Sequence, residues 1–170
     1  MKNVGIIGAG TMGIGIAQVA ATNGCNVWIY DANAKQVETA TVGLEKTLTK
    51  LVDKQKISSE KMTEILANIS IATELKDFKD CELIIEAIIE NKEIKTKVFT
   101  ELEKHVSENC VIGSNTSSIS ITSLGAELQK PERFIGIHFF NPAPLMPLVE
   151  VIPSLLTEKS LAEKIYNLMK

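Results

Sequence analysis

The sequence predicts an α/β fold in which helices cover both faces of a doubly wound, mostly parallel β-sheet. Two observations carry this prediction. Predicted strands and helices alternate along the chain, and the strands read as continuous apolar runs, which is typical of strands buried on both faces. The chain has 170 residues, of which 45% are hydrophobic and 23% charged. This length and composition suit one globular domain that buries its own core.

The N-terminal segment predicts a strand, a helix and a second strand. Residues 4–7 form a short apolar run, and residues 12–22 have the small, apolar pattern of a closely packed helix. Residues 26–30 are rich in β-branched and aromatic side chains and are followed by Asp31. A strand–helix–strand unit of about 30 residues joins two parallel strands.

A helical hairpin is predicted after the second strand. Residues 33–54 read as a long amphipathic helix with an apolar stripe and a surface of lysines and glutamates. Ser58 can cap a second helix, which runs to residue 67. The insertion therefore spans about residues 33–67.

The remainder of the chain again alternates between strands and helices. The predicted strands are residues 69–72, 83–87, 110–113 and 133–139, with an extended segment at 148–152. The predicted helices are residues 92–106, 119–128 and 157–170. Three prolines between residues 141 and 147 exclude a regular helix there.

The composition argues against several classes of function. A formal net charge of −3 without a clustered basic excess argues against a nucleic-acid or anionic-membrane partner. No apolar run is long enough to span a bilayer. Cys25, Cys81 and Cys110 form no C-x-x-C pair and match no zinc-site spacing. We therefore expect no bound metal, three reduced thiols and a cytoplasmic location.

A dinucleotide-binding pattern, G-x-G-x-x-G, runs over Gly-Ala-Gly-Thr-Met-Gly between the first strand and the first helix. Gly8 permits the tight turn, and Gly10 lets the backbone approach a pyrophosphate. Gly13 lets the helix pack closely against the strand. Thr11 and Met12 open the helix, whose free N–H groups and positive end attract phosphate.

Asp31 indicates which dinucleotide binds. It follows Gly13 by 18 residues, near the roughly 20 expected of the acidic residue that binds the adenosine ribose. A carboxylate accepts hydrogen bonds from ribose hydroxyls and repels a 2′-phosphate, so the predicted cofactor is NAD rather than NADP. The alternative is a glycine-rich turn that binds FAD, another nucleotide or nothing.

His138 and Glu150 are the candidates for proton transfer. His138 ends an apolar strand, at the edge of the sheet where ligands bind. Glu150 follows twelve residues later in an apolar stretch, where a carboxylate needs a partner, and we expect the intervening loop to bring the imidazole to it. Such a pair orients a general base for alcohol oxidation by a nicotinamide cofactor. An equal alternative is that His138 packs under the proline-rich loop and Glu150 bonds to backbone N–H groups.

Four ordered segments together resemble the L-3-hydroxyacyl-CoA dehydrogenases. They are Gly-Ala-Gly-Thr-Met-Gly at 8–13, Glu-Ala-Ile-Ile-Glu-Asn at 86–91, Ser-Asn-Thr-Ser-Ser at 114–118, and His-Phe-Phe-Asn-Pro at 138–142 followed by Leu-Val-Glu-Val at 148–151. The resemblance covers the whole chain. It implies a Rossmann-type domain that binds NAD.

The resemblance also implies catalytic roles for individual residues. His138 corresponds to the catalytic base, and Glu150 to the carboxylate that orients it. Ser117 and Asn141 resemble the polar groups beside the substrate hydroxyl and the nicotinamide. These two residues are therefore expected both in catalysis and in cofactor binding.

Further matches to the family concern residues that contact NAD and coenzyme A. Glu90 and Lys95 lie at positions that contact NAD in the family. In the helical hairpin, Lys54 matches a lysine that meets the coenzyme A phosphates, and Thr47 stands where relatives have a serine. Ser117 is implied in substrate binding as well.

The implied reaction transfers a hydride between NAD and C3 of a short-chain L-3-hydroxyacyl-CoA, giving the 3-oxoacyl-CoA. The expected substrates are acetoacetyl-CoA and 3-hydroxybutyryl-CoA, in fatty acid and butyrate metabolism. The family's chain continues into a helical dimerisation domain, so we expect residues 1–170 to be the N-terminal cofactor domain of a homodimeric protein. The alternatives are an NAD-binding module, or a structural relative, without significant turnover.

Overall fold

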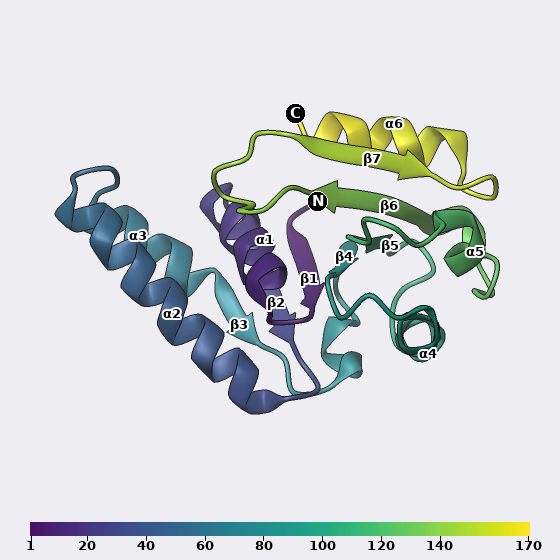
Figure 1. Cartoon of the computed structure of the whole chain (residues 1–170), viewed down its shortest axis with the longest axis horizontal. Coiled ribbons are helices and arrows are strands. Elements are labelled where there is room, and N and C mark those ends of the chain that lie inside the picture. Colours follow the sequence, from purple (N-terminus) through teal and green to yellow (C-terminus); the bar gives the residue numbers. More distant parts are fainter.

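One seven-stranded sheet organises the chain in the computed structural model, which describes residues 1–170 (Figure 1). Its strands are β1 (Asn3–Ile7), β2 (Asn26–Tyr30), β3 (Ile69–Ile71), β4 (Leu83–Glu86), β5 (Val111–Ser114), β6 (Phe134–Phe139) and β7 (Val149–Pro153). They lie in the order β3-β2-β1-β4-β5-β6-β7, and all pairs are parallel except β6 with the edge strand β7. The predicted doubly wound, mostly parallel sheet is therefore confirmed.

Helices cover both faces of this sheet. One face carries α1 (Thr11–Thr22), α2 (Ala34–Asp53), α3 (Ser59–Ala67) and α6 (Lys159–Leu168). The other carries α4 (Lys92–Leu102), α5 (Ile121–Gly125) and the 3₁₀ turn η1 (Leu75–Phe78). A second 3₁₀ turn, η2 (Pro131–Arg133), leads into β6. None of the helices combines the length and the apolar character needed to cross a bilayer.

The predicted helical hairpin lies between β2 and β3. The hydroxyl of Ser58 accepts the N–H of Lys61 at 3.1 Å, which caps α3. The buried residues of α2 are Val37, Leu44 and Leu48, which belong to the apolar stripe seen in the sequence. α2 and α3 pack against each other and against α1, on the β3 side of the molecule (Figure 1).

The helices α4, α5 and α6 are shorter than the sequence indicates: α4 ends at Leu102, α5 has only five residues, and α6 runs only from Lys159 to Leu168. Before α5, Thr116 Oγ1 accepts the N–H of Ile119 at 3.0 Å, and Ser120 Oγ accepts the N–H of Ser123 at 3.2 Å. The Thr116 bond lies in the turn and competes with helix formation there, whereas the Ser120 bond caps the first turn of α5, so this helix begins only at Ile121. The polar turn after β5 therefore extends further than predicted, and it positions part of the site described below.

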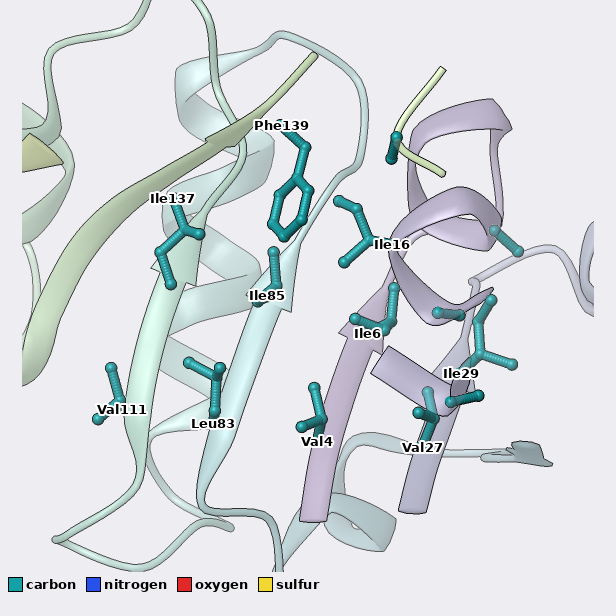
Figure 2. Packing of buried hydrophobic residues seen from close by; sticks show 14 of the residues in the cluster. Val4, Ile6, Ile16, Val27, Ile29, Leu83, Ile85, Val111, Ile137 and Phe139 are labelled. Carbon is teal, nitrogen blue, oxygen red and sulfur yellow. The ribbon is translucent and has the colours of Figure 1, made fainter. Parts of the chain in front are cut away.

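The hydrophobic core has two parts, one on each face of the sheet. Figure 2 shows Ile6 of β1 and Ile85 of β4 on the same side as Ile16 of α1. The neighbouring Ile7 and Ile84 belong to the cluster on the opposite face, because successive strand residues point to opposite sides. Burial on both faces explains the continuous apolar runs. The parallel pairing of β1, β4, β5 and β6 brings their carboxyl ends to the same end of the sheet.

The three cysteines are free thiols, and Cys81 and Cys110 are buried. Burial raises the pKa of each of these two thiols to about 12. Cys25 is only partly buried, and burial raises its pKa as well. Thiols in this state are poor nucleophiles, so they contribute to packing rather than to chemistry.

Candidate active site

The glycine turn between β1 and α1 has the shape of a phosphate cradle. Gly8 has a φ of +107°, and a Cβ on it would lie 2.5 Å from the carbonyl oxygen of Ala87. A Cβ on Gly13 would lie 1.8 Å from the carbonyl oxygen of Gly8. A Cβ on Gly10 would meet nothing within 4 Å, and Gly10 starts α1 without a side-chain cap. This open side leaves room for a phosphate against the first N–H groups of α1.

Asp31 links the glycine turn to the start of α2. Its Oδ2 accepts the N–H of Ala9 at 2.8 Å, and its Oδ1 accepts the N–H of Asn33 at 2.9 Å. From α2, Gln36 Nε2 donates to the carbonyl oxygen of Ala9 at 3.1 Å. Asp31 and Gln36 line a cavity of about 440 Å³ whose other walls are mostly apolar. An apolar cavity with one carboxylate suits a nucleoside whose ribose binds that carboxylate.

A second cavity, of about 330 Å³, lies at the carboxyl ends of β4, β5 and β6. It shares Ala87 and Ile88 with the first cavity, so the two cavities flank the same segment after β4. The predicted site residues in its walls are Met12, Glu90, Lys95, Ser117, His138 and Asn141. A dinucleotide that crosses the glycine turn can place one end in each cavity.

His138 and Glu150 pair directly. Nδ1 of His138 lies 2.8 Å from Oε2 of Glu150, and the ring packs on Phe140 at 4.8 Å between centroids. The two residues face each other in the register of β6 and β7, so strand pairing brings them together, not the loop that the sequence indicated. Glu150 is also half-exposed, at 51% of its side chain, which corrects the expected burial of this carboxylate. The arrangement excludes the alternative in which the pair does not form.

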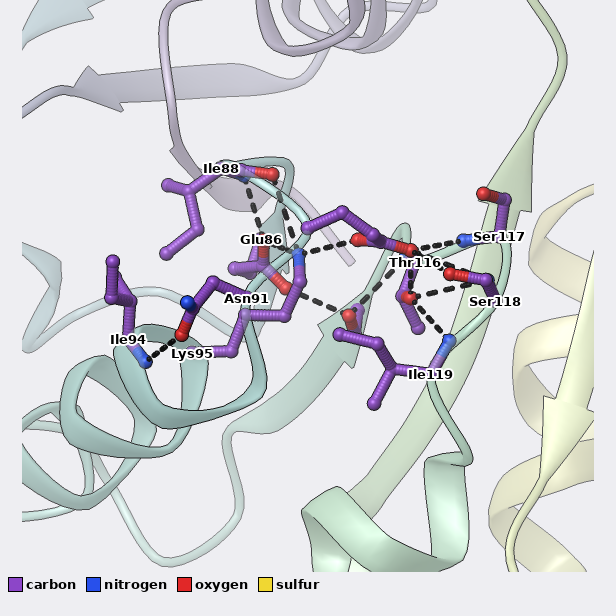
Figure 3. A network of polar contacts seen from close by, with 11 residues as sticks. Glu86, Ile88, Asn91, Ile94, Lys95, Thr116, Ser117, Ser118 and Ile119 are labelled. Atoms are coloured by element: carbon purple, nitrogen blue, oxygen red, sulfur yellow. Dashed lines mark hydrogen bonds and ion pairs between the residues drawn. The ribbon is translucent and has the colours of Figure 1, made fainter.

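Glu90 and Lys95 belong to one polar network, which is buried at Lys95 and partly exposed at Glu90 (Figure 3). The Lys95 ammonium lies 2.5 Å from Glu86 Oε1 and 3.2 Å from Glu90 Oε2, and its side chain is 1% exposed. Burial by itself raises the pKa of Glu90, but the hydrogen bond from the Thr116 hydroxyl and the charge of Lys95 outweigh it. The pKa of Glu90 is therefore held at about 2. This carboxylate stays ionised at any physiological pH.

Glu90 also holds the polar turn after β5. Its Oε1 accepts the N–H of Ser117 at 3.0 Å, the N–H of Ser118 at 3.2 Å and the hydroxyl of Ser118 at 3.0 Å. One residue before Thr116, Asn115 Oδ1 accepts the N–H of Phe139 at 2.8 Å, which ties the turn to the end of β6. Ser117 is thereby placed in the wall of the cavity that His138 also lines.

Thr47 and Lys54 do not reach this cavity. The Thr47 hydroxyl donates to the carbonyl oxygen of Gly43 at 2.9 Å, within α2. Lys54 is exposed and follows the last residue of α2, on the helical hairpin. Asn141, by contrast, begins the loop after β6 and lines the cavity. No three His, Cys, Asp or Glu side chains come together in a way that could hold a metal ion.

Sequence reasoning missed several residues that build the site. They are Gln36, Glu86, Ser114, Asn115 and Thr116. A signal existed for Glu86, because it ends an otherwise apolar buried strand, where a carboxylate needs partners. No comparable signal marks Gln36, which is one polar residue among many on α2.

A crevice with room for a dinucleotide, and with a carboxylate-oriented imidazole at one end, defines the class of the protein: the cofactor domain of a dehydrogenase. Sequence comparison narrows this class. The model of the family "3-hydroxyacyl-CoA dehydrogenase, NAD binding domain" matches residues 3–170, and the chain belongs to this family. The assignment confirms NAD as the cofactor.

Individual relatives support the same family assignment. The 3-hydroxybutyryl-CoA dehydrogenase of Bradyrhizobium diazoefficiens is 44% identical over 163 residues, which are 96% of this chain and 56% of the relative. The enzyme of the same name from Clostridioides difficile is 41% identical over 97% of this chain and 59% of its own length. The crystal structure of (S)-3-hydroxybutyryl-CoA dehydrogenase from Ralstonia eutropha superimposes with a TM-score of 0.96 at 41% identity, over 99% of this chain and 60% of that one. The chain thus spans a little over half the length of these relatives.

Proposed function

We propose that this chain is the part of a 3-hydroxyacyl-CoA dehydrogenase that binds NAD and carries the catalytic base. The observation that carries the proposal is the His138–Glu150 pair, 2.8 Å apart, with His138 in the wall of the cavity beside the glycine turn. The family assignment supports the reaction, which is transfer of a hydride between NAD and C3 of an L-3-hydroxyacyl-CoA.

His138 moves the proton in this proposal. Its Nδ1 is bonded to Glu150, which leaves Nε2 without a protein partner. A neutral imidazole that donates Nδ1–H to a carboxylate has its lone pair on Nε2. Nε2 therefore takes the proton of the C3 hydroxyl during oxidation and returns it to the carbonyl oxygen during reduction. Glu150 keeps the ring oriented and stabilises the imidazolium that forms.

The residues around the glycine turn fit NAD. The open side of Gly10 and the N–H groups of α1 suit the pyrophosphate, and Asp31 suits the adenosine ribose. Glu90, Lys95, Ser117 and Asn141 would hold the nicotinamide end, because they line the same cavity as His138. NAD, when bound, supplies the hydride acceptor for alcohol oxidation.

The substrate in this proposal is a short-chain acyl-CoA: acetoacetyl-CoA in reduction and 3-hydroxybutyryl-CoA in oxidation. The names of the similar proteins from three bacteria support this chain length. Ser117 would meet the reacting end of the acyl group beside His138. Thr47 and Lys54 would meet the coenzyme A part, since an exposed ammonium on the hairpin attracts phosphate.

NAD binding without turnover is the second candidate function. The observation in its favour is that Thr47 and Lys54 line neither cavity, so they form no continuous site with His138. A coenzyme A ester bound at the hairpin would then have too few contacts near His138 to fix its C3 atom. In that case the chain binds the cofactor and lacks an assembled substrate site.

Two measurements on this chain test the proposal: calorimetric titration with NADH, and NADH oxidation that depends on acetoacetyl-CoA. We expect NADH to bind and acetoacetyl-CoA to be reduced at a small fraction of the rate of the longer relatives. Binding without any turnover would support the second candidate function. Absence of NADH binding would overturn both.

A further inference from the structure

Glu86 is a fully buried carboxylate at the end of β4, where it has no direct access to either cavity. Its Oε2 accepts the hydroxyl of Ser114 at 2.7 Å, from the end of β5. Its Oε1 accepts the N–H of Ile88 at 2.7 Å and the ammonium of Lys95 at 2.5 Å. A buried carboxylate is tolerated only with such partners, so the surrounding residues are arranged around its charge.

Lys95 connects the buried carboxylate of Glu86 to the cavity that His138 lines. Besides Glu86, its ammonium lies 3.2 Å from Glu90 Oε2 and 3.3 Å from the carbonyl oxygen of Ile88. These three acceptors match the three protons of the ammonium. The direction of each proton is therefore set, and Glu90 is held in one place by a charged donor.

Glu90 in turn holds the turn that presents Ser117, through the N–H groups of Ser117 and Ser118. We propose that Glu86 is a positioning residue for the cofactor end of the site. It acts through Lys95 and Glu90 on the position of Ser117 (Figure 3). The inference rests on the proposed function only for the role of Ser117 beside the bound cofactor.

If Glu86 only packed β4 against α4, it would not need a charge or a charged partner. Replacing a buried ion pair by apolar side chains of similar volume is often neutral or stabilising, so a charge pair is an inefficient way to pack β4 against α4. The charges of Glu86 and Lys95 do set one orientation of the ammonium, which an apolar contact cannot do. In that orientation the ammonium contacts Glu90, which accepts the N–H of Ser117.

The chain offers a matched control in its other buried ion pair. Glu103 Oε1 lies 3.3 Å from Arg133 Nη2, and Glu103 also accepts the N–H groups of Gln129 and Lys130. Neither Glu103 nor Arg133 lines the two cavities. Loss of the Glu103 charge therefore reports on stability alone.

The experiment compares Glu86→Gln, Glu86→Asp and Glu103→Gln in the ligand-free chain by the ¹⁵N–¹H amide resonances of Ser117 and Ser118. Thermal unfolding and NADH titration complete the set. We expect both Glu86 variants to move these two resonances, although neither amide contacts Glu86. Glu86→Gln should also lower the Tm by about 10 °C and weaken NADH binding by about tenfold. Glu103→Gln should lower the Tm similarly and leave the two resonances and NADH binding unchanged.

Wild-type amide positions in the Glu86 variants would overturn the proposal, and so would an equal displacement in Glu103→Gln. If Glu86→Gln does not fold, Glu86→Asp decides, because it keeps the charge and only shortens the reach to Lys95. The resonances require neither cofactor nor turnover. A chain that fails to reduce acetoacetyl-CoA would therefore count against the proposed function and leave this test standing.

Discussion

His138 and Glu150 face each other across the antiparallel pair of β6 and β7, with Nδ1 of the imidazole 2.8 Å from Oε2 of the carboxylate. Residues opposite each other in such a pair have their Cβ atoms about 4.5–5.5 Å apart, close enough for two side chains to meet without bending the backbone. Because the ladder holds the backbone of both residues, each side chain can be changed without moving the backbone of the other. The proton acceptor and its orienting group can therefore be tested separately.

His138→Gln should abolish the reduction of acetoacetyl-CoA, because it removes the only imidazole in the cavity. Positioned general bases contribute about 10²–10⁴-fold to rate. NADH affinity should stay at the wild-type value, since the glycine turn is unchanged. Steady-state rates and calorimetry on the same sample measure both quantities. An equal loss of NADH binding would identify His138 as a structural residue.

Glu150→Gln should lower kcat by about 10²-fold, because the imidazole loses the carboxylate that orients it and stabilises its protonated form. The half-exposed position of Glu150 predicts little change in the free energy of unfolding, within about 0.5 kcal/mol. Glu163→Gln, at an exposed position on α6, is the control and should leave kcat unchanged. Full activity of Glu150→Gln would show that the carboxylate of Glu150 contributes nothing to the reaction.

Gly10→Ala and Gly13→Ala should separate cofactor binding from folding. The methyl group that Gly10→Ala adds has open space in the folded chain, so the free energy of unfolding should change by no more than about 1 kcal/mol. The same methyl group would occupy the approach of the pyrophosphate and weaken NADH binding by about tenfold or more.

Gly13→Ala should instead lower the free energy of unfolding by about 1–3 kcal/mol or more, because its Cβ would lie 1.8 Å from the carbonyl oxygen of Gly8. Urea unfolding and NADH titration on both variants provide the comparison. Wild-type NADH affinity in Gly10→Ala would contradict the assignment of this turn to the pyrophosphate.

The lowered pKa of Glu90 predicts that this residue makes a pH-dependent contribution to the free energy of unfolding. Its pKa of about 2 in the folded chain lies below the ordinary value of 4.5, so ionised Glu90 stabilises the fold above pH 4.5 and loses this effect as the pH falls toward 2. Glu90→Gln should therefore be less stable than the wild type at pH 7, and the two should converge toward pH 2. The side chain is 38% exposed, so solvent screening keeps the difference modest. Denaturant unfolding at several pH values measures it, and a constant difference would contradict the prediction.

Lys54→Gln should raise the KM for acetoacetyl-CoA and leave NADH affinity unchanged, because Lys54 is proposed to attract the coenzyme A phosphates. The effect should shrink at high salt, since an exposed charge is screened within about 10 Å at 0.1 M ionic strength. Lys79→Gln removes another exposed ammonium, which follows η1 outside the hairpin, and is the control. Equal KM values for the two variants would remove Lys54 from the substrate site.

The parts of the site that could be predicted are those that depend on neighbours in sequence. Gly13 is required by a contact within its own turn, Gly8 has the positive φ of that turn, and Asp31 follows directly from the end of β2. The approach of Ala87 to Gly8, in contrast, depends on the pairing of β1 with β4. The pairing of His138 with Glu150 was predicted from charge burial and a loop. It forms instead through strand register, around a carboxylate that is half-exposed.

The order of strands and helices, the cofactor turn and the family resemblance can all be predicted from the sequence. These depend on residue periodicity, on glycines where a side chain cannot fit, and on short ordered motifs. The connection from Glu86 through Lys95 and Glu90 to Ser117, by contrast, exists only in the folded chain. The reason is physical: a buried charge selects its partners by distance and burial after the strands have paired, and residues 28 positions apart, such as Glu86 and Ser114, carry no local signal of that contact.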